Sequence, residues 1–320
     1  MSLVVGKSPT RTPPIRSITP HPVARGLVRP LWSYVAAVVA GLLVLDLFQS
    51  ELSYATAIAL LGVGLFAALA VAAPKSRPGL FHFNVDRADL VMIAGVYAVV
   101  VAFYRLAFVI VDNNDLLLFA FFAAGLLVGV AGPVVYTVWG RRRSLATLGL
   151  SGANLPQAVV LALLFAAVQF SITFWRYDGL PGTKDLVTLS GMALMVGIFE
   201  TIFFRGFIQG RLEISFGTAP AVFGAAFLYG AYHVGYGMGL DAIVFLGGLG
   251  IVYALAYATA NNFLLVFPLL TPVGSLFAQL DEGELVGRLP WAALLGFADV
   301  IAVTLTILWF ARKHERKPRW

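Results

Sequence analysis

The strongest constraint on the fold is a series of long apolar stretches that together take up most of the chain. Hydrophobic residues make up 60% of the 320 residues and charged residues only 12%. Soluble globular domains carry about 25% charged residues, and a helix needs about 20 apolar residues to cross the hydrocarbon core of a bilayer. The composition therefore excludes a soluble globular class and predicts an all-α fold, a polytopic integral membrane bundle of helices.

Apolar stretches of span length predict about ten transmembrane helices, of which the seventh and ninth are short. An alternative with eight spans treats the seventh and eighth helices as re-entrant and keeps the same sidedness. The ten predicted spans are residues 31–49, 54–73, 88–111, 115–139, 156–175, 186–209, 219–234, 240–260, 262–279 and 290–311.

Basic residues between the predicted spans gather in alternate segments. With a cytoplasmic N-terminus, most of the 22 Lys and Arg residues fall inside, and only Arg176, Lys184 and Arg288 fall in outside loops. Cytoplasmic loops of membrane proteins carry an excess of Lys and Arg. The charge pattern therefore predicts a multi-pass plasma-membrane protein with both termini in the cytoplasm.

The polar segments divide the chain into four regions. Residues 1–30 are rich in Pro and basic residues without an acid, which predicts a disordered cytoplasmic tail. Residues 31–140 are expected to form accessory N-terminal membrane helices, and residues 156–311 the membrane core that carries the polar anomalies. The basic loop from Arg141 to Arg143 lies at the seam, and residues 312–320 form a second basic cytoplasmic tail.

Residue usage also bounds the chemistry of the protein. The chain has no cysteine, which excludes disulfides and thiolate metal sites. Only His233 of the four histidines lies within a predicted span, so a zinc site with three protein ligands would be hard to build in the membrane. We therefore expect no cofactor, although the sequence does not decide whether a metal takes part. The excess of Arg over Lys is typical of a GC-rich genome such as an actinobacterium's.

The stretch FETIFFRGFIQGRL, from Phe199 to Leu212, places two charges inside an apolar helix. Each charged side chain near the bilayer centre costs about 3 kcal/mol on insertion scales, so Glu200 and Arg205 require a functional or structural partner. Five residues apart on an α-helix, they point about 140° away from each other. This spacing argues against a simple ion pair between them.

Depth along the chain assigns Glu200 a different neighbour. Glu200 lies 17 residues before Gly217, the centre of a predicted polar turn from Arg211 to Thr218, and His233 lies 16 residues after it. At about 1.5 Å per residue the two side chains lie at the same depth on antiparallel helices. They are expected to face each other as a base and a proton carrier for water activation. In the competing interpretation, Glu200 pairs with Arg205 and His233 donates to a backbone carbonyl at a helix end.

These residues also carry a family resemblance. FETIFFRGFIQGRL resembles the first motif, EE-x-x-x-R-G-x-x-Q, of the CAAX-protease and bacteriocin-processing (CPBP) family of intramembrane endopeptidases. Tyr229-Gly-Ala-Tyr-His233 is similar to the family's aromatic-x-x-x-His motif, and the resemblance covers roughly residues 186–280. It implies that Glu200 is the general base that activates water and that His233 assists it with protons and the tetrahedral intermediate.

The chain departs from the family pattern at two motifs. Thr201 replaces the second Glu, so Arg205 lacks its usual partner four residues away and is expected to reach a backbone carbonyl or to extend toward water. The family's later His-x-x-x-Asn motif is missing, and the segment VFPLLTPVGSLFAQ contains no His. Thr271 and Ser275, four residues apart, are the hydroxyls placed to replace its oxyanion-stabilising role.

Two classes of function follow from these patterns, with a transporter-like function as a third alternative. The first is an intramembrane endopeptidase that cuts a peptide or membrane-protein substrate near its C-terminus or at the edge of a transmembrane segment. The second is a catalytically degenerate family member, a scaffold or stoichiometric membrane-protein partner in a transporter or envelope complex. Both place the chain in a lipid bilayer, and neither involves nucleic acid.

Overall fold

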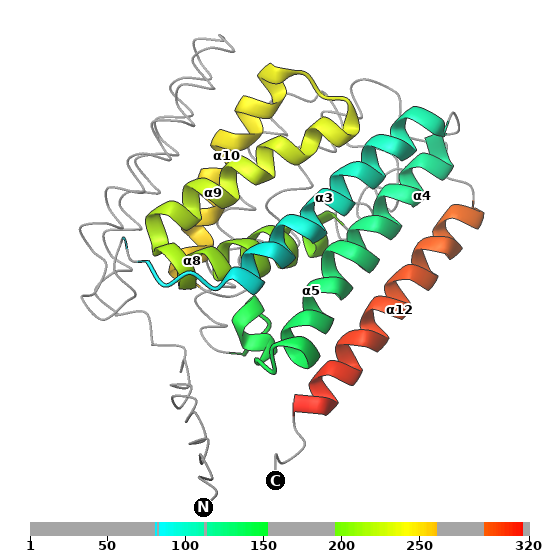
Figure 1. The fold of residues 1–320 in the computed structure, drawn as a ribbon. Coiled ribbons are helices and arrows are strands. Elements are labelled where there is room, and N and C mark those ends of the chain that lie inside the picture. The colour runs from blue at the N-terminus through cyan, green and yellow to red at the C-terminus, as the bar shows by residue number, and fades with distance from the viewer. Residues whose placement is uncertain (1–80, 82, 112–113, 153–195, 261–290, 316–320) are drawn as a thin grey trace, which may run out of the picture.

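The computed structural model describes residues 81, 83–111, 114–152, 196–260 and 291–315. All regular structure within these ranges is helical, which confirms the predicted all-α class (Figure 1). Two helices in the described ranges, Arg87–Ile110 and Phe119–Gly140, are long and apolar enough to cross a membrane. The number of spans remains a prediction, because the first, second, fifth and ninth predicted spans lie outside the described residues.

The first described unit is an antiparallel pair of long helical runs. Helix α3 (Arg87–Ile110) starts at Asp86, whose carboxylate accepts hydrogen bonds from two backbone N–H groups of the first turn. The return run combines α4 (Asn114–Ala124), π-helix η1 (Gly125–Ala131), α5 (Gly132–Val135) and π-helix η2 (Tyr136–Gly140). Pro133 has no backbone N–H and crowds the carbonyl of the preceding turn, which accounts for the wide turn before it.

A short 3₁₀ helix, η3 (Leu145–Leu148), follows the basic loop and is capped by Ser144, whose hydroxyl accepts from the backbone N–H of Ala146. It packs directly on the central helical run of the molecule. A Cβ at Gly206 of that run would lie 2.4 Å from the carbonyl oxygen of Leu148. Glycine is therefore required for this close approach of two backbones.

The central run consists of the helical residues 196–200, π-helix η4 (Thr201–Gln209) and α8 (Gly210–Phe216). The predicted polar turn from Arg211 to Thr218 is wrong, because helical structure continues to Phe216. Gly217 alone makes the reversal with a φ of 91°, a conformation that glycine adopts without a Cβ penalty. Arg211 is accommodated within the helix because Thr137 and Thr147 hydrogen-bond its guanidinium.

Beyond Gly217 the chain returns as α9 (Thr218–Ala231) and 3₁₀ helix η5 (Tyr232–Tyr236), then reverses again into α10 (Leu240–Ala260). Figure 1 shows α9 and α10 side by side. A Cβ at Gly230 would lie 2.6 Å from the carbonyl oxygen of Ile243, and one at Gly250 would lie 2.9 Å from the ring of Tyr229. Small residues thus let the two helices approach closely, as is common in membrane bundles.

The last described helix, α12 (Trp291–Glu315), packs along the return run of the first pair (Figure 1). Its C-terminal end lies at the basic loop, where the Glu315 carboxylate accepts a hydrogen bond from the backbone N–H of Leu145. The ring of His314 also lies 5.6 Å from that of Trp139. Residues of the predicted accessory region and of the predicted core are therefore in direct contact at this end of the bundle.

Candidate active site

Glu200 lies at the start of η4 between two tyrosine hydroxyls. Tyr232 donates a hydrogen bond of 2.6 Å to Oε1, and Tyr229 donates one of 3.2 Å to Oε2. The glutamate is 5% exposed. Both oxygens of this buried carboxylate thus have a hydroxyl donor, which offsets part of the cost of removing its charge from water.

The backbone around Glu200 is fixed by tight packing against η1. A Cβ at Gly129 would lie 2.3 Å from the ring of Phe199, and one at Gly125 would also contact that ring. Every residue of η4, from Thr201 to Gln209, is buried. π-Helical turns occur frequently at functional sites, and this one begins directly after Glu200.

His233 lies on η5, one residue after Tyr232. Its Nδ1 lies 2.9 Å from the carbonyl oxygen of Tyr229 and 3.3 Å from that of Gly230, so Nδ1 carries the hydrogen and donates. In the neutral ring this assignment leaves Nε2 as the acceptor. The imidazole centroid lies 4.0 Å from that of the Tyr232 ring.

The predicted juxtaposition of Glu200 and His233 is observed in an indirect form. Both side chains contact Tyr229 and Tyr232, so the sequence correctly placed them at a common depth. The competing interpretation is also met in one half, because His233 does bind a backbone carbonyl. Its other half is not met among the described residues, where the ion pairs involve neither Glu200 nor Arg205.

Arg205 is buried between aromatic rings. Its guanidinium carbon lies 5.0 Å from the ring centroid of Tyr229 and 5.9 Å from that of Tyr253. The expectation that Arg205 reaches a carbonyl or extends toward water is therefore wrong, since the side chain is 2% exposed and Nη1 has no hydrogen-bond partner among the described residues. Cation–π contact holds the guanidinium instead.

The π-helix explains why both charges meet at one residue. The 140° separation of Glu200 and Arg205 was reckoned for an α-helix, whereas hydrogen bonds from residue i to i+5 bring residues five apart to about one turn. Tyr229 accordingly contacts Glu200 with its hydroxyl and Arg205 with its ring face.

Other motif positions have structural roles that the contacts define. Gln209 donates hydrogen bonds of 2.8 Å to the carbonyl of Ala254 and 3.0 Å to Glu213, which ties η4 to α10. Thr201 is fully buried, and its hydroxyl has no partner among the described residues. Thr271 and Ser275 lie outside the described residues.

Tyr104 and Tyr232 belong to the site and were not predicted from the sequence. Tyr104 comes from α3, is 2% exposed, and lies 6.2 Å from the rings of Tyr232 and Phe199 and 5.0 Å from that of Tyr236. Nothing in an apolar helix marks such a tyrosine in advance. Tyr232 did leave a signal, because residues three apart share a helix face and the motif residue Tyr229 precedes it by three.

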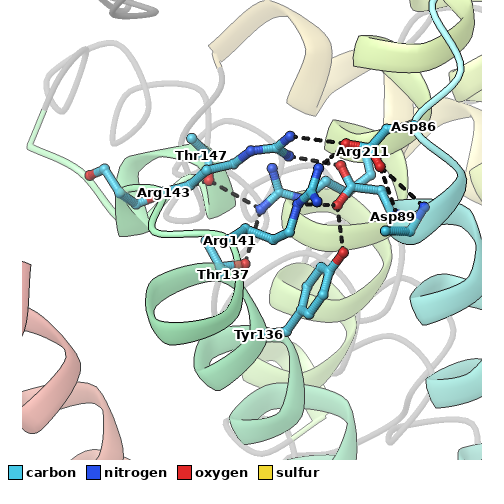
Figure 2. Close-up of polar contacts among 10 residues, drawn as sticks. Asp86, Asp89, Tyr136, Thr137, Arg141, Arg143, Thr147 and Arg211 are labelled. Atoms are coloured by element: carbon cyan, nitrogen blue, oxygen red, sulfur yellow. Dashed lines mark hydrogen bonds and ion pairs between the residues drawn. The ribbon is translucent and has the colours of Figure 1, made fainter. Parts of the chain in front are cut away.

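A second polar cluster, termed here the end cluster, joins α3, η2, η3 and α8 at one end of the bundle (Figure 2). Asp89 is completely buried and accepts hydrogen bonds from Tyr136 at 2.8 Å and Arg143 at 2.7 Å, with Arg141 at 3.3 Å. Asp86 pairs with the same two arginines. The predicted topology places the segments of Arg87, Arg141–Arg143, Arg211 and the C-terminal tail on one side, and the described parts of all four lie at this end.

Arg211 completes the end cluster from α8. Its Nη2 donates hydrogen bonds to Thr137 at 3.0 Å and to Thr147 at 3.4 Å. Burial and the neighbouring Arg143 lower the pKa of Arg211 to about 10, so the guanidinium remains charged at neutral pH. This residue links the helix that carries Glu200 to the first helical pair.

Comparison with known proteins identifies one family. Residues 181–269 match the family model described as type II CAAX prenyl endopeptidase Rce1-like, and this segment includes Glu200, Arg205, Tyr229 and His233. No curated protein and no solved structure matches the chain. The match confirms the family resemblance over this segment and, with the two apolar helices, supports a membrane-embedded protein. Among the residues that the structure describes, no group of three or more His, Asp or Glu side chains is placed to hold a metal ion.

Proposed function

We propose that the protein is an intramembrane endopeptidase of the CAAX-protease and bacteriocin-processing type, in which Glu200 activates water and His233 assists. The observation that carries this proposal is the pairing of a buried carboxylate with a neighbouring imidazole through two shared tyrosines. A purely structural glutamate in a membrane helix has no need of a histidine with its Nε2 left as an acceptor.

The arrangement supports a simple sequence of proton transfers. Each carboxylate oxygen has two lone pairs, and the tyrosines occupy one on each, so Glu200 retains acceptor capacity for a water proton. Glu200 takes that proton as water attacks the scissile carbonyl carbon, and His233 Nε2 exchanges a proton with the departing amine. General acid–base groups of this kind contribute about 10²- to 10⁴-fold in rate.

The substrate class we propose is a peptide or membrane protein cut near its C-terminus or at a transmembrane edge. We place the protein in the plasma membrane with both termini in the cytoplasm, which the gathering of basic segments at one end of the bundle supports. Fusions of alkaline phosphatase and of a fluorescent protein to each terminus test this topology. Phosphatase activity at either end would refute it.

The test of activity uses the full chain in lipid nanodiscs with a quenched, farnesylated peptide that ends in a CAAX sequence. Glu200→Gln and His233→Ala are each expected to lower cleavage by about 10²-fold or more, since each removes one proton carrier. Glu213→Gln makes the same chemical change two helical turns or more away and is the matched control, expected to cleave normally. Wild-type cleavage by both Glu200→Gln and His233→Ala would refute the proposal.

The proposed hydrolysis draws its proton transfers from Glu200 and His233 and needs no resident metal ion. Treatment of the full chain with EDTA or 1,10-phenanthroline is therefore expected to leave cleavage unchanged. Loss of cleavage on chelation, restored by added zinc, would overturn the metal-free mechanism and leave the peptidase assignment in place.

A second candidate function is a non-catalytic scaffold or partner subunit, favoured by Thr201 in the place of the family's second Glu. Its buried hydroxyl has no partner among the described residues, so it offers no substitute for a carboxylate near Arg205. A stoichiometric membrane protein that co-purifies in mild detergent, together with an unchanged substrate profile in Glu200→Gln cells, would select this function over the peptidase.

A further inference from the structure

The proposed reaction needs a hydrogen-bond donor for the oxyanion, and no motif residue of the described site supplies one. The carbonyl oxygen of a peptide gains a negative charge when water attacks, and a fixed donor about 3 Å away stabilises it. The family's third motif, which has this role by resemblance, is missing from the sequence. Tyrosine hydroxyls are among the side chains that serve as such donors.

We propose that Tyr232 is a catalytic residue whose hydroxyl donates to the substrate oxyanion, an inference that rests on the proposed peptidase function. Its Oη lies 2.6 Å from Oε1 of Glu200, so it lies beside the position of any water that this carboxylate activates. A carbonyl attacked by that water comes within hydrogen-bond reach of the same hydroxyl.

The Tyr232 ring is fixed while its O–H remains free to turn. The side chain is 1% exposed, and its ring packs against those of Phe204 at 4.8 Å, Tyr236 at 5.5 Å and Phe199 at 5.9 Å. Rotation about the Cζ–Oη bond redirects the hydrogen without moving the ring. The donor is thus positioned before the reaction, which is the condition under which it lowers the barrier most.

The redirection of the hydrogen follows from the proton balance of the reaction. Water gives a proton to Glu200 as its oxygen bonds to the carbonyl carbon, and the carbonyl oxygen becomes an oxyanion. The protonated Glu200 is then a weaker acceptor than the oxyanion, so the Tyr232 hydrogen bond shifts to the substrate. When the oxyanion collapses, the C–N bond breaks, the amine takes a proton from His233 or Glu200, and the Tyr232 hydroxyl returns to the carboxylate.

Tyr229 is the nearest competitor for this role, and its contacts assign it elsewhere. Its hydrogen bond to Glu200 is longer, 3.2 Å, and its ring face holds the Arg205 guanidinium. Its backbone carbonyl also accepts from His233. Tyr229 is therefore a positioning residue that holds Glu200, Arg205 and His233 in place.

The test compares Tyr232→Phe and Tyr229→Phe in the full chain in nanodiscs, with the farnesylated CAAX peptide as substrate. Both changes remove one hydroxyl and keep the ring, and Tyr257→Phe in α10 is the control for loss of a buried hydroxyl elsewhere. Tyr232→Phe is expected to lower kcat by about 10²- to 10³-fold with KM unchanged, the usual cost of losing one oxyanion donor. Tyr229→Phe is expected to lose about tenfold or less, the value of one hydrogen bond that positions a group.

Two further measurements separate a catalytic from a structural role. A phosphinate analogue of the peptide mimics the tetrahedral intermediate, and its Ki is expected to rise in Tyr232→Phe by the same factor as kcat/KM falls. If Tyr232→Phe does not fold, 3-fluorotyrosine at position 232 gives a more acidic hydroxyl in nearly the same volume. The alkaline limb of its kcat profile is then expected to move to lower pH.

The outcomes distinguish this inference from the proposed function. Wild-type cleavage by Glu200→Gln would refute the peptidase itself. An inactive Glu200→Gln with a Tyr232→Phe within about threefold of wild type would overturn only the role of Tyr232. Equal losses in the two Tyr→Phe variants, or an unmoved alkaline limb with 3-fluorotyrosine, would reduce Tyr232 to a residue that holds the carboxylate.

Discussion

Replacement of Asp89 by Asn is the most informative test of how the two parts of the bundle are held together. Asp89 is completely buried in the end cluster, where its carboxylate accepts from Tyr136 and Arg143 and lies 3.3 Å from Arg141. Asn has the same shape but no charge, and its amide would direct N–H groups at nitrogens that are themselves donors. The two arginines would then lose their buried counter-charge.

The expected cost follows from burial. Removing one partner of a buried ion pair costs about 3–5 kcal/mol, because the remaining charge is left uncompensated. Asp86, only three residues away, pairs with the same arginines but its side chain is 26% exposed. Asp86→Asn is therefore expected to cost about 1 kcal/mol or less, since Asn also caps helices well and partly exposed pairs are weak.

The assay is unfolding of the full chain in mixed micelles with increasing SDS, followed by far-UV circular dichroism. Asp89→Asn is expected to move the midpoint strongly to lower SDS, and Asp86→Asn only slightly. The double variant Asp89→Asn/Arg143→Gln is expected to recover part of the loss, because it removes one of the unpaired charges as well. Equal effects of the two single Asn variants would refute the argument that burial makes the Asp89 pairs strong.

Two further predictions concern the central helix. Gly206→Ala is expected to destabilise the protein by more than 1 kcal/mol, since overpacked cores lose about 1–3 kcal/mol and the new Cβ would meet the Leu148 carbonyl. Gly95→Ala in α3, with no atom within 4 Å of the added Cβ, is its control and is expected to be neutral or stabilising in the same SDS titration. Arg205→Lys is expected to lower stability by about 1–2 kcal/mol, because Lys keeps the buried charge but loses the planar contact with the Tyr229 ring. A midpoint equal to wild type for Arg205→Lys would show that the guanidinium plane is not what holds the charge.

The sequence predicted the helix positions well where apolar length alone decides them. The predicted spans 88–111 and 240–260 correspond to Arg87–Ile110 and Leu240–Ala260 in the structure. Counting residues from Gly217 also placed Glu200 at the depth of Tyr229–His233. Rise per residue is nearly constant along helices, so depth is a property that sequence spacing carries well.

Side-chain direction in η4 could not be predicted in the same way. The angle between Glu200 and Arg205 depends on the number of residues per turn, and the change from α- to π-helix has no mark in the sequence. The aromatic contact of Arg205 with Tyr253 is another case, because it needs α10 to pack on η4, 48 residues further along. Contacts between distant helices, such as that of Tyr104 with Tyr232, depend on the packed bundle and not on any local pattern.

The end cluster has a consequence for the order in which the chain assembles in the membrane. Its aspartates and their arginines are 54 to 57 residues apart, so these pairs can close as soon as the fourth predicted span is inserted. Arg211 reaches Thr147 and Thr137 across 64 and 74 residues and joins only when α8 has been synthesised. The first helical pair therefore forms a finished platform during translation, and the helix that carries Glu200 docks onto it later.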